Sequence, residues 1–165
     1  MAEAGDDQWA GSNFQLPPLG GPVALCGACR RLGRCRLGLG REDLQADGSV
    51  VTHLVCDASN EGGPAVAHGG WTASVLDEVL GHVPLLAREL AVTGQLTVTY
   101  VKPVPIEHAL VARAWTERRE GHRWYVDGEL LLAASGAVLA RGSAIMVVRP
   151  SDHFARHRAW LAEQD

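Results

Sequence analysis

A His-Gly-Gly step followed by two adjacent acids is the part of this sequence best suited to chemistry. Residues 62–82 read GGPAVAHGGWTASVLDEVLGH, and Asp77 and Glu78 lie within its apolar second half. An acid inside an apolar helix is costly unless it is paired or used. Glycines that open a helix leave backbone N–H groups available to a negative charge. The stretch therefore predicts a site that stabilises an oxyanion and positions water or a base.

A helix is expected to carry these acids. It opens near Gly69 and runs to about Gly81, and Pro84 predicts a break followed by another turn or two. Positions three, four and seven residues from Asp77 share its face and are mostly small: Gly70, Ala73, Ser74, Leu80 and Gly81. Such a face leaves room for a ligand or another backbone. The apolar positions around it indicate a helix buried on most sides, as a wrapped sheet would bury it.

Strand-like segments flank this helix in the sequence. Residues 36–44 and 49–56, joined by an Asp47-Gly48 turn, predict a hairpin before it. Four segments follow it, at 95–101, 109–116, 123–133 and 137–148, with a charged turn at 117–122 and a bulge at 127–128. One helix between a hairpin and a meander indicates an α+β fold rather than alternating βαβ units.

Length and composition limit the number of domains and the classes of partner. The chain has 165 residues, enough for one domain with a real core, and its net charge of −4 argues against a nucleic-acid partner. No apolar run approaches the ~20 residues that span a membrane, and the acidic N-terminus lacks a signal peptide, so we expect a cytoplasmic protein. We expect a poorly ordered tail at 1–22, the domain at 23–150 and a helical extension at 151–165.

Four cysteines raise the question of a metal. Cys26 and Cys29 form a CxxC pair, Cys35 and Cys56 follow, and His53 is a conceivable fourth ligand. The second half-site lacks a standard zinc spacing, so we favour ordinary reduced thiols and no metal. The alternative is a zinc-dependent interaction element. The same segment is locally basic, which suits either a solvated face or a rim that attracts phosphate.

The sequence also resembles a known family. Two motifs are similar to those of hotdog-fold acyl-CoA thioesterases: HGG followed by six residues and then Asp-Glu, and the run LTVTYVKPVP at 96–105. The likeness is greatest to the PaaI-like branch and its mammalian mitochondrial relatives, and it runs from about Cys26 to Pro150. It implies an antiparallel β-sheet wrapped around one long central helix. It also implies a homodimeric hydrolase of lipid metabolism that cleaves acyl-CoA and needs no cofactor.

The resemblance assigns roles to individual positions. Gly69 matches the residue whose backbone N–H polarises the thioester carbonyl. Asp77 matches the acid that activates water or attacks that carbonyl, and Thr93 matches a hydroxyl that orients the water. The usual Pro-Gly before HGG is absent, and Gly62 stands where some relatives have Asn. Asn60 is the nearest substitute as a second oxyanion donor.

Helix geometry predicts that the site is shared between subunits. Gly69 and Asp77 are eight residues apart, or roughly 12 Å along a helix. A thioester carbon held ~3 Å from the Gly69 N–H is out of reach of Asp77 in the same chain. If both act on one substrate, they come from different subunits. We therefore expect a homodimer with two sites, and the sequence leaves a homotetramer open.

Several neighbouring residues complete the candidate set. His68 is either a catalytic imidazole or, as we favour, a structural group that hydrogen-bonds the loop. Glu78 is expected to be a structural or interface acid. Gly70, Trp71 and Ser74 are candidate pocket residues, although Trp71 is most simply core. No GxSxG elbow accompanies Ser74, so a serine hydrolase is not indicated.

Cations at strand ends and in the charged turn are candidates for the CoA phosphates. They are Lys102, Arg118, Arg119, His122 and Arg123. Two alternatives to acyl-CoA hydrolysis stay open. One is hydrolysis of a thioester on an acyl-carrier protein, and the other is a non-catalytic acyl-CoA sensor. The presence of both Asp77 and Thr93 argues against the sensor.

Overall fold

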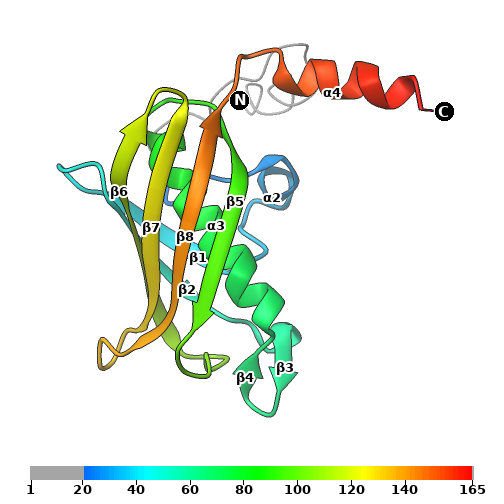
Figure 1. Ribbon diagram of the computed structural model, residues 1–165. Helices are drawn as coiled ribbons and strands as arrows, with labels where there is room; N and C mark the ends of the chain where they lie inside the picture. The colour runs from blue at the N-terminus through cyan, green and yellow to red at the C-terminus, as the bar shows by residue number, and fades with distance from the viewer. Residues whose placement is uncertain (1–20, 165) are drawn as a thin grey trace.

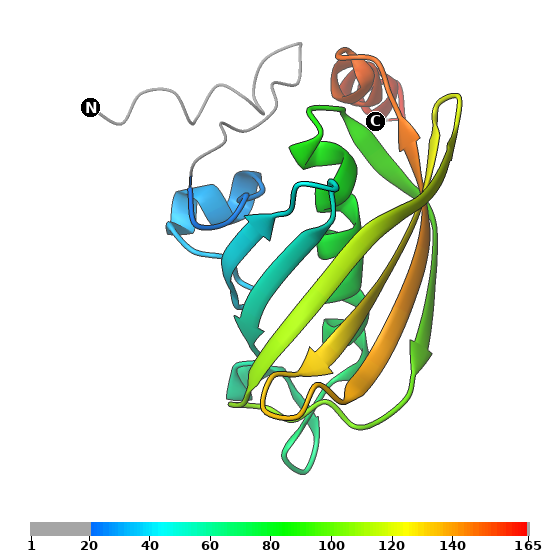
Figure 2. The same ribbon diagram turned by 90° about the vertical axis from the view of Figure 1, so that its left-hand side faces the viewer.

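A six-stranded antiparallel sheet curls around one long helix, α3 (Figures 1 and 2). The structure, a computed structural model, describes residues 21–164, so the tail predicted at 1–22 lies almost wholly outside the described residues. The sheet order is β1-β2-β6-β7-β8-β5, with strands β1 Leu39–Leu44, β2 Val50–Val55, β5 Ala91–Tyr100, β6 Ala109–Glu120, β7 Arg123–Leu132 and β8 Val138–Val148. This arrangement confirms the expected hotdog fold.

The predicted N-terminal hairpin is present. β1 pairs with β2 in antiparallel register from Leu39↔Leu54 to Leu44↔Val50. Gly48 has a φ of 84°, a conformation suited to glycine, and the Asp47 carboxylate accepts the Ser49 N–H at 2.9 Å. β2 then pairs with β6, which joins the hairpin to the meander.

Helix α3, Gly69–Leu86, is longer than predicted because Pro84 does not break it. Pro84 sits in the last turn, where few backbone bonds remain to be lost, and its ring is buried. The chain leaves the helix three residues later, with the Ala87 N–H bonded to the Val83 carbonyl at 3.2 Å. The helix continues through the proline because burial of its apolar face outweighs the missing bond.

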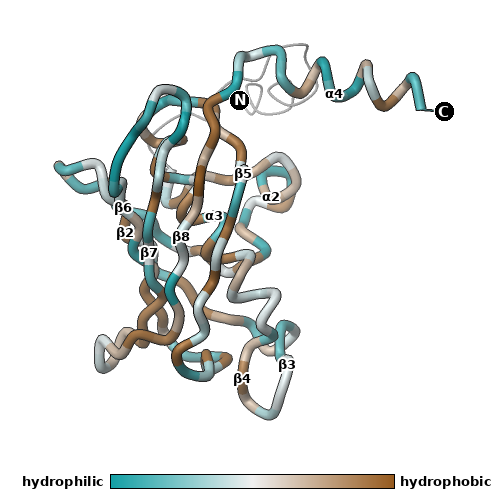
Figure 3. Tube along the Cα trace, viewed as in Figure 1, coloured by the Kyte–Doolittle hydropathy of each residue, from teal (hydrophilic) through white to brown (hydrophobic). Residues whose placement is uncertain are grey.

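The core lies between α3 and the concave face of the sheet. Its largest fully buried side chains include Leu76 and Leu80 from the helix and Leu110, Leu130 and Met146 from the sheet. Figure 3 shows hydrophobic segments along α3 and along the strands that surround it. One face of α3 stays outside this core, because Gly70 and Ser74 are exposed and Asp77 is half-buried. The helix is therefore less enclosed than the sequence predicts.

The meander differs from prediction in its lengths and bulges. β5 begins four residues early, so Thr93 lies inside the strand, and β6 runs through most of the predicted charged turn. β7 has no bulge at Asp127-Gly128. A Cβ on Gly128 would lie 2.6 Å from the Arg113 carbonyl oxygen and 3.0 Å from Leu80 Cδ2. Gly128 therefore permits close packing of helix and sheet rather than a bulge.

The remaining elements are short and lie at the edges. They are α2 Gly27–Leu32, the 3-10 turn Ala58–Asn60, the small hairpin β3 Glu61–Gly63 with β4 Val66–Ala67, and α4 His153–Ala162. α4 projects away from the sheet and buries none of its residues (Figure 1). Among the described residues, no helix combines the length and apolar character that crossing a membrane requires.

Candidate active site

The first turn of α3 presents backbone N–H groups at one end of the molecule. The His68 ring caps this turn, its Nδ1 accepting the Gly70 N–H at 2.9 Å. The His68 carbonyl accepts the N–H groups of Trp71 and Thr72. The Gly69 N–H, the first of the helix, has no acceptor within it. His68 is thus positioned as a cap, and Gly69 is positioned as a donor to an anion.

The β3–β4 hairpin and strand β5 hold this turn in place. The His68 N–H donates to the Asn60 carbonyl at 2.8 Å, which sets Asn60 beside the helix start. A Cβ on Gly62 would lie 2.6 Å from His68 Cα, so only glycine allows this approach. From the other side, the Tyr100 hydroxyl donates to the Gly69 carbonyl at 2.9 Å. This contact could not be predicted from the sequence, because Tyr100 is an ordinary position in an alternating strand.

A pocket of about 300 Å³ opens at this helix start, and we call it the Gly69 pocket. Gly69, Thr72, Tyr100, Lys102 and Val104 are among its lining residues. It therefore combines a helix N-terminus with one exposed cation. An anionic group is the ligand that this lining favours.

Asp77 lies two turns further along α3 and is paired with Thr93. The Thr93 hydroxyl donates to Asp77 Oδ1 at 2.7 Å. Thr93 precedes an irregularity in the β5–β8 pairing, between Thr93 and Gln95. The two predicted residues, sixteen positions apart in the sequence, thus meet across the helix and the edge strand. The second carboxylate oxygen, Oδ2, is not engaged by Thr93.

A second pocket, of about 290 Å³, surrounds this pair, and we call it the Asp77 pocket. Its polar lining comes from Asp77, Glu78, His82 and Thr93. Its apolar lining comes from Leu25, Leu85, Leu90, Val92 and Phe154, with Ala24, Cys26, Gly81 and Ala91 between them. The pocket has mostly apolar walls and one carboxylate beside a hydroxyl, which is a typical composition for a small-molecule site.

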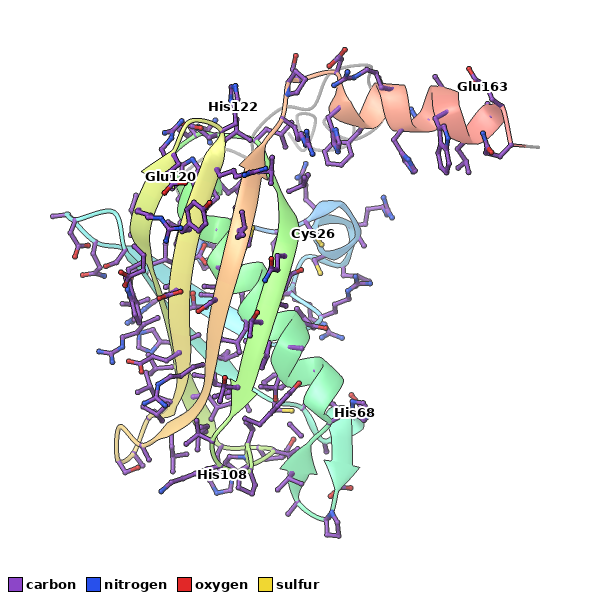
Figure 4. All side chains as sticks on the ribbon, in the orientation of Figure 1. Cys26, His68, His108, Glu120, His122 and Glu163 are labelled. Atoms are coloured by element: carbon purple, nitrogen blue, oxygen red, sulfur yellow. The ribbon has the colours of Figure 1, made fainter. Side chains whose placement is uncertain are left out.

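The two pockets share no lining residue and lie toward opposite ends of α3. Gly69 and Asp77 are separated by eight helical residues, or roughly 12 Å. On β5, Tyr100 lies in the first pocket and Thr93 in the second, at the two ends of the strand. Figure 4 shows the same separation, with His68 at the lower end and Cys26 nearer the upper end. Within one chain, the predicted donor and the predicted base do not converge.

Behind Asp77 lies a buried ionic network that the sequence analysis missed. His82 contacts Glu42 through Nδ1 and Glu78 through Nε2, the latter at 3.1 Å. The side chains of His82 and Glu42 are 4% and 3% exposed, and that of Glu78 is 30% exposed. The spacing of Glu78 and His82, four residues apart, was a visible signal for half of this network. Its Glu42 half depends on the tertiary fold.

The network sets the charges of its members. Burial alone would lower the pKa of His82, but the hydrogen bonds to Glu42 and Glu78 outweigh it and raise that pKa to about 9. Burial would raise the pKa of Glu78, but the hydrogen bond from His82 outweighs it and lowers that pKa. His82 is therefore a cation at neutral pH, and Glu78 is an anion.

The other predicted site residues take separate places. The Ser74 hydroxyl donates to the Gly70 carbonyl at 2.8 Å on the exposed face of α3. Trp71 is a core side chain, 5% exposed, with its indole N–H unpaired. Arg119 makes a bidentate ion pair with Glu89, at 2.6 and 2.9 Å. Arg123 is exposed at the start of β7, at the opposite end of the sheet from Lys102. The predicted cations are therefore not one cluster.

The cysteines do not gather into a metal centre. Cys29, Cys35 and Cys56 are buried free thiols, and Cys26 is a half-buried one. His53 lies on β2 beside Arg41 and Asp43. Within residues 21–164, no group of three His, Cys, Asp or Glu side chains is arranged to hold a metal ion. Burial also raises the pKa of Cys56 to about 11, so this thiol stays protonated.

Comparison with known proteins agrees with this fold. The family model described as Thioesterase superfamily matches residues 65–138, a range that contains both Gly69 and the Asp77–Thr93 pair. Over these residues the chain is similar to the thioesterase superfamily. An uncharacterised protein of Schizosaccharomyces pombe is 37% identical over 90 residues, covering 51% of this chain and 49% of that protein. Acyl-coenzyme A thioesterase THEM4 of Mus musculus is 30% identical over 67 residues, covering 41% of this chain and 29% of that protein.

Solved structures show the same fold. A hypothetical thioesterase from Streptococcus pneumoniae, crystallised with coenzyme A, superposes with a TM-score of 0.62 at 20% identity, covering 67% of this chain and 86% of that one. A mutant of the phenylacetic acid degradation protein PaaI from Thermus thermophilus gives a TM-score of 0.60 at 21% identity, covering 67% and 93%. The match to the curated relatives spans half of their length or less.

Proposed function

We propose that this protein is a member of the thioesterase superfamily and hydrolyses an acyl-CoA thioester to a free carboxylic acid and CoA. The observation that carries the proposal is the Asp77–Thr93 pair, joined at 2.7 Å in a pocket with mostly apolar walls. A non-catalytic binding module has no need of a carboxylate oriented by a hydroxyl. The apolar lining suits the acyl group, and the carboxylate lies where the thioester carbonyl of that group would enter.

Asp77 supplies the reactive group in this proposal. As a general base, its carboxylate takes a proton from water while the water oxygen attacks the thioester carbon. As a nucleophile, it attacks the carbon directly and forms an anhydride that water then cleaves. In both routes the C–S bond breaks and the CoA thiolate leaves and is protonated. Thr93 holds the Asp77 carboxylate through Oδ1, which leaves Oδ2 for water or the carbonyl carbon.

The Gly69 N–H stabilises the oxyanion that develops on the carbonyl. Because it lies roughly 12 Å along α3 from Asp77 of its own chain, the proposal brings the two together across a homodimer interface. Gly69 of one subunit then faces Asp77 of its partner, and the dimer has two sites. A protein that sediments as a monomer while fully active would contradict this arrangement.

The CoA portion is proposed to bind near the Gly69 pocket. The Streptococcus pneumoniae protein of the same fold was crystallised with coenzyme A. In this chain Lys102 lines the Gly69 pocket beside the helix N-terminus, a combination that attracts phosphate. Arg119 is held by Glu89 and is less suited to that role.

A hydrolysis screen over acyl-CoA thioesters tests the proposal. Thiol release is measured for aliphatic and aromatic acyl groups with the wild type, Asp77→Asn and Asp43→Asn. Asp43 is an acid in the β1–β2 hairpin and lines neither pocket, so it is the matched control. We expect turnover by the wild type and the control, and a loss of at least ~10²-fold in Asp77→Asn. Equal turnover by wild type and Asp77→Asn on the best substrate would refute the role of Asp77.

A further inference from the structure

One side of the Asp77 pocket is formed by a segment that precedes the domain's first strand. Ala24, Leu25 and Cys26 line the pocket opposite the α3 residues. Leu25 is half-buried and packs against the hydrophobic core. This segment lies before the part of the chain that the family model matches. This wall therefore comes from outside residues 65–138.

Glu42 of β1 holds that wall in place. Its Oε1 accepts the Ala24 N–H at 3.3 Å, and its own N–H donates to the Pro22 carbonyl at 2.7 Å. These two bonds flank residue 23 and fix the path of the chain into the pocket. Because both bonds reach backbone groups of the segment, they depend on the position of Glu42 and not on which side chains the segment carries.

Glu42 is fixed in turn by the buried network. Its Oε2 accepts the Thr52 hydroxyl at 3.2 Å and contacts His82 Nδ1. His82 reaches Glu78, which lines the pocket next to Asp77. Beside the Ala24 N–H and the Thr52 hydroxyl, His82 supplies the positive charge that the buried Glu42 carboxylate requires. A continuous chain of contacts thus runs from α3 through His82 and Glu42 to the wall.

We infer that the Glu42–His82 pair is a latch that holds residues 24–26 as the wall of the acyl pocket, so that Leu25 limits the bulk of the acyl group. The inference rests on the proposed function, since it assigns the acyl group to the Asp77 pocket. At about 290 Å³ the pocket is at the lower end of the usual range for ligand sites, roughly 300–1,000 Å³. The substrate class is therefore an acyl-CoA with a short or compact acyl group.

Leu25→Ala tests the wall directly. The ratio of kcat/KM for dodecanoyl-CoA to that for butanoyl-CoA is measured in the wild type, in Leu25→Ala and in Leu44→Ala. Leu44 is an exposed leucine of β1 outside the pocket, so it controls for loss of an apolar side chain. We expect the ratio to rise ~10-fold or more in Leu25→Ala, since a methylene in an apolar pocket changes specificity by about 10–200-fold. Leu44→Ala should leave it unchanged.

His82→Gln and Glu42→Gln test the latch. Amide hydrogen exchange is followed at Ala24 and Glu42, with Val126 of β7 as an internal reference. We expect faster exchange at the Ala24 and Glu42 amides and unchanged exchange at Val126. The ratio of kcat/KM for dodecanoyl-CoA to that for butanoyl-CoA should rise, as in Leu25→Ala. Combining His82→Gln with Leu25→Ala should add little, because both changes remove the same wall. Glu42→Gln keeps the side-chain volume but removes the negative charge that pairs with His82, so it tests the same ion pair where His82→Gln does not fold.

The outcomes distinguish a failure of the proposed hydrolysis from a failure of the proposed wall or latch. A wild type that hydrolyses no acyl-CoA overturns the proposed function and the selectivity inferred from it. An active wild type whose ratio is unchanged by Leu25→Ala overturns the wall alone. Unchanged exchange at Ala24 in both latch variants overturns the latch.

Discussion

Asp77 gains its significance from Thr93, which lies on a different element. A carboxylate on the exposed side of a helix is ordinary, but this one accepts a 2.7 Å hydrogen bond and lines an apolar pocket. The hydroxyl has one hydrogen to donate, and the charged Asp77 Oδ1 at 2.7 Å is a stronger acceptor for it than Met146 Sδ at 3.6 Å. That contact fixes the carboxylate orientation before substrate arrives, which is what positioning for attack requires.

Thr93→Val preserves side-chain shape and removes the hydroxyl, and with it the bond to Asp77 and the longer contact with Met146 Sδ at 3.6 Å. We expect kcat to fall by roughly 10- to 100-fold, the value of one hydrogen bond to a charged group, with KM little changed. Steady-state kinetics on the best acyl-CoA measures this. Thr97→Val, an exposed position of the same strand, is the control. A fall of equal size in both variants would mean that the effect comes from the strand and not from Asp77.

At the scale of elements, the start of α3 depends on close approach by the β3–β4 hairpin. Gly62 passes so near His68 that a methyl group would lie 2.6 Å from its Cα. His68 in turn caps the helix and aligns the Gly69 peptide. From the sequence, Gly62 was noted only as a departure from the family pattern. Its packing role could not be predicted, because it depends on a contact between two elements.

Gly62→Ala should therefore displace the helix cap. We expect a loss of about 1–3 kcal/mol in the free energy of unfolding, as for other overpacked sites. Denaturant titration measures the loss. Gly63→Ala is the matched control, since its methyl would meet only the flexible end of Val66, at 3.3 Å. Equal stability of the two variants would contradict the close packing at Gly62.

The Glu42–His82–Glu78 network gives α3 and β1 a shared dependence on pH. The pKa of His82 is raised in the fold from 6.5 to about 9, so the folded state binds a proton that the unfolded state releases. The stabilisation is complete below about pH 6.5 and is lost as pH rises through about 9. The lowered pKa of Glu78 also stabilises the fold, but this contribution is lost only as pH falls below about 4.5, outside this window.

Denaturant titrations between pH 6 and pH 9 check this dependence. We expect the free energy of unfolding of the wild type to decline across the interval. His82→Gln should be less stable at pH 6 and should lack most of the decline. A variant that keeps the full pH dependence would show that another group is responsible.

At the scale of the whole molecule, most of the fold was predictable and part of the site was not. Alternation in the strands, the turn at Asp47-Gly48 and the apolar helix after His68 are local signals, and the hairpin, meander and helix follow them. The helix break predicted at Pro84 was wrong, because burial of this residue outweighs its local tendency to end a helix. Glu42, Tyr100 and Leu25 carry no local signal, since their roles arise only where separate elements meet.

The arrangement of the two pockets is the main consequence at this scale. The proposed oxyanion donor, Gly69, and the proposed base, Asp77, lie on one helix but in separate pockets. One chain therefore holds half of each of two sites in the proposed dimer. This is a stronger claim than dimerisation alone, because it requires the subunits to exchange catalytic groups.

Mixed dimers test that claim most directly. One subunit carries Asp77→Asn and the other Gly69→Pro, which removes the N–H. Proline is favoured at the first helical position, and His68 already has the extended ψ of 137° that a following proline requires. Each variant alone should lose about 10²–10³-fold in kcat. The isolated mixed dimer then pairs an intact Gly69 with an intact Asp77 at one of its two sites.

We predict that this mixed dimer recovers about half of the wild-type kcat per dimer, because one site in two is whole. Thiol release from the best acyl-CoA is measured on the mixed dimer isolated through two different affinity tags. Both parent homodimers are assayed beside it. Activity no higher than that of the parents would place the base and the donor within one chain, and would contradict the shared site.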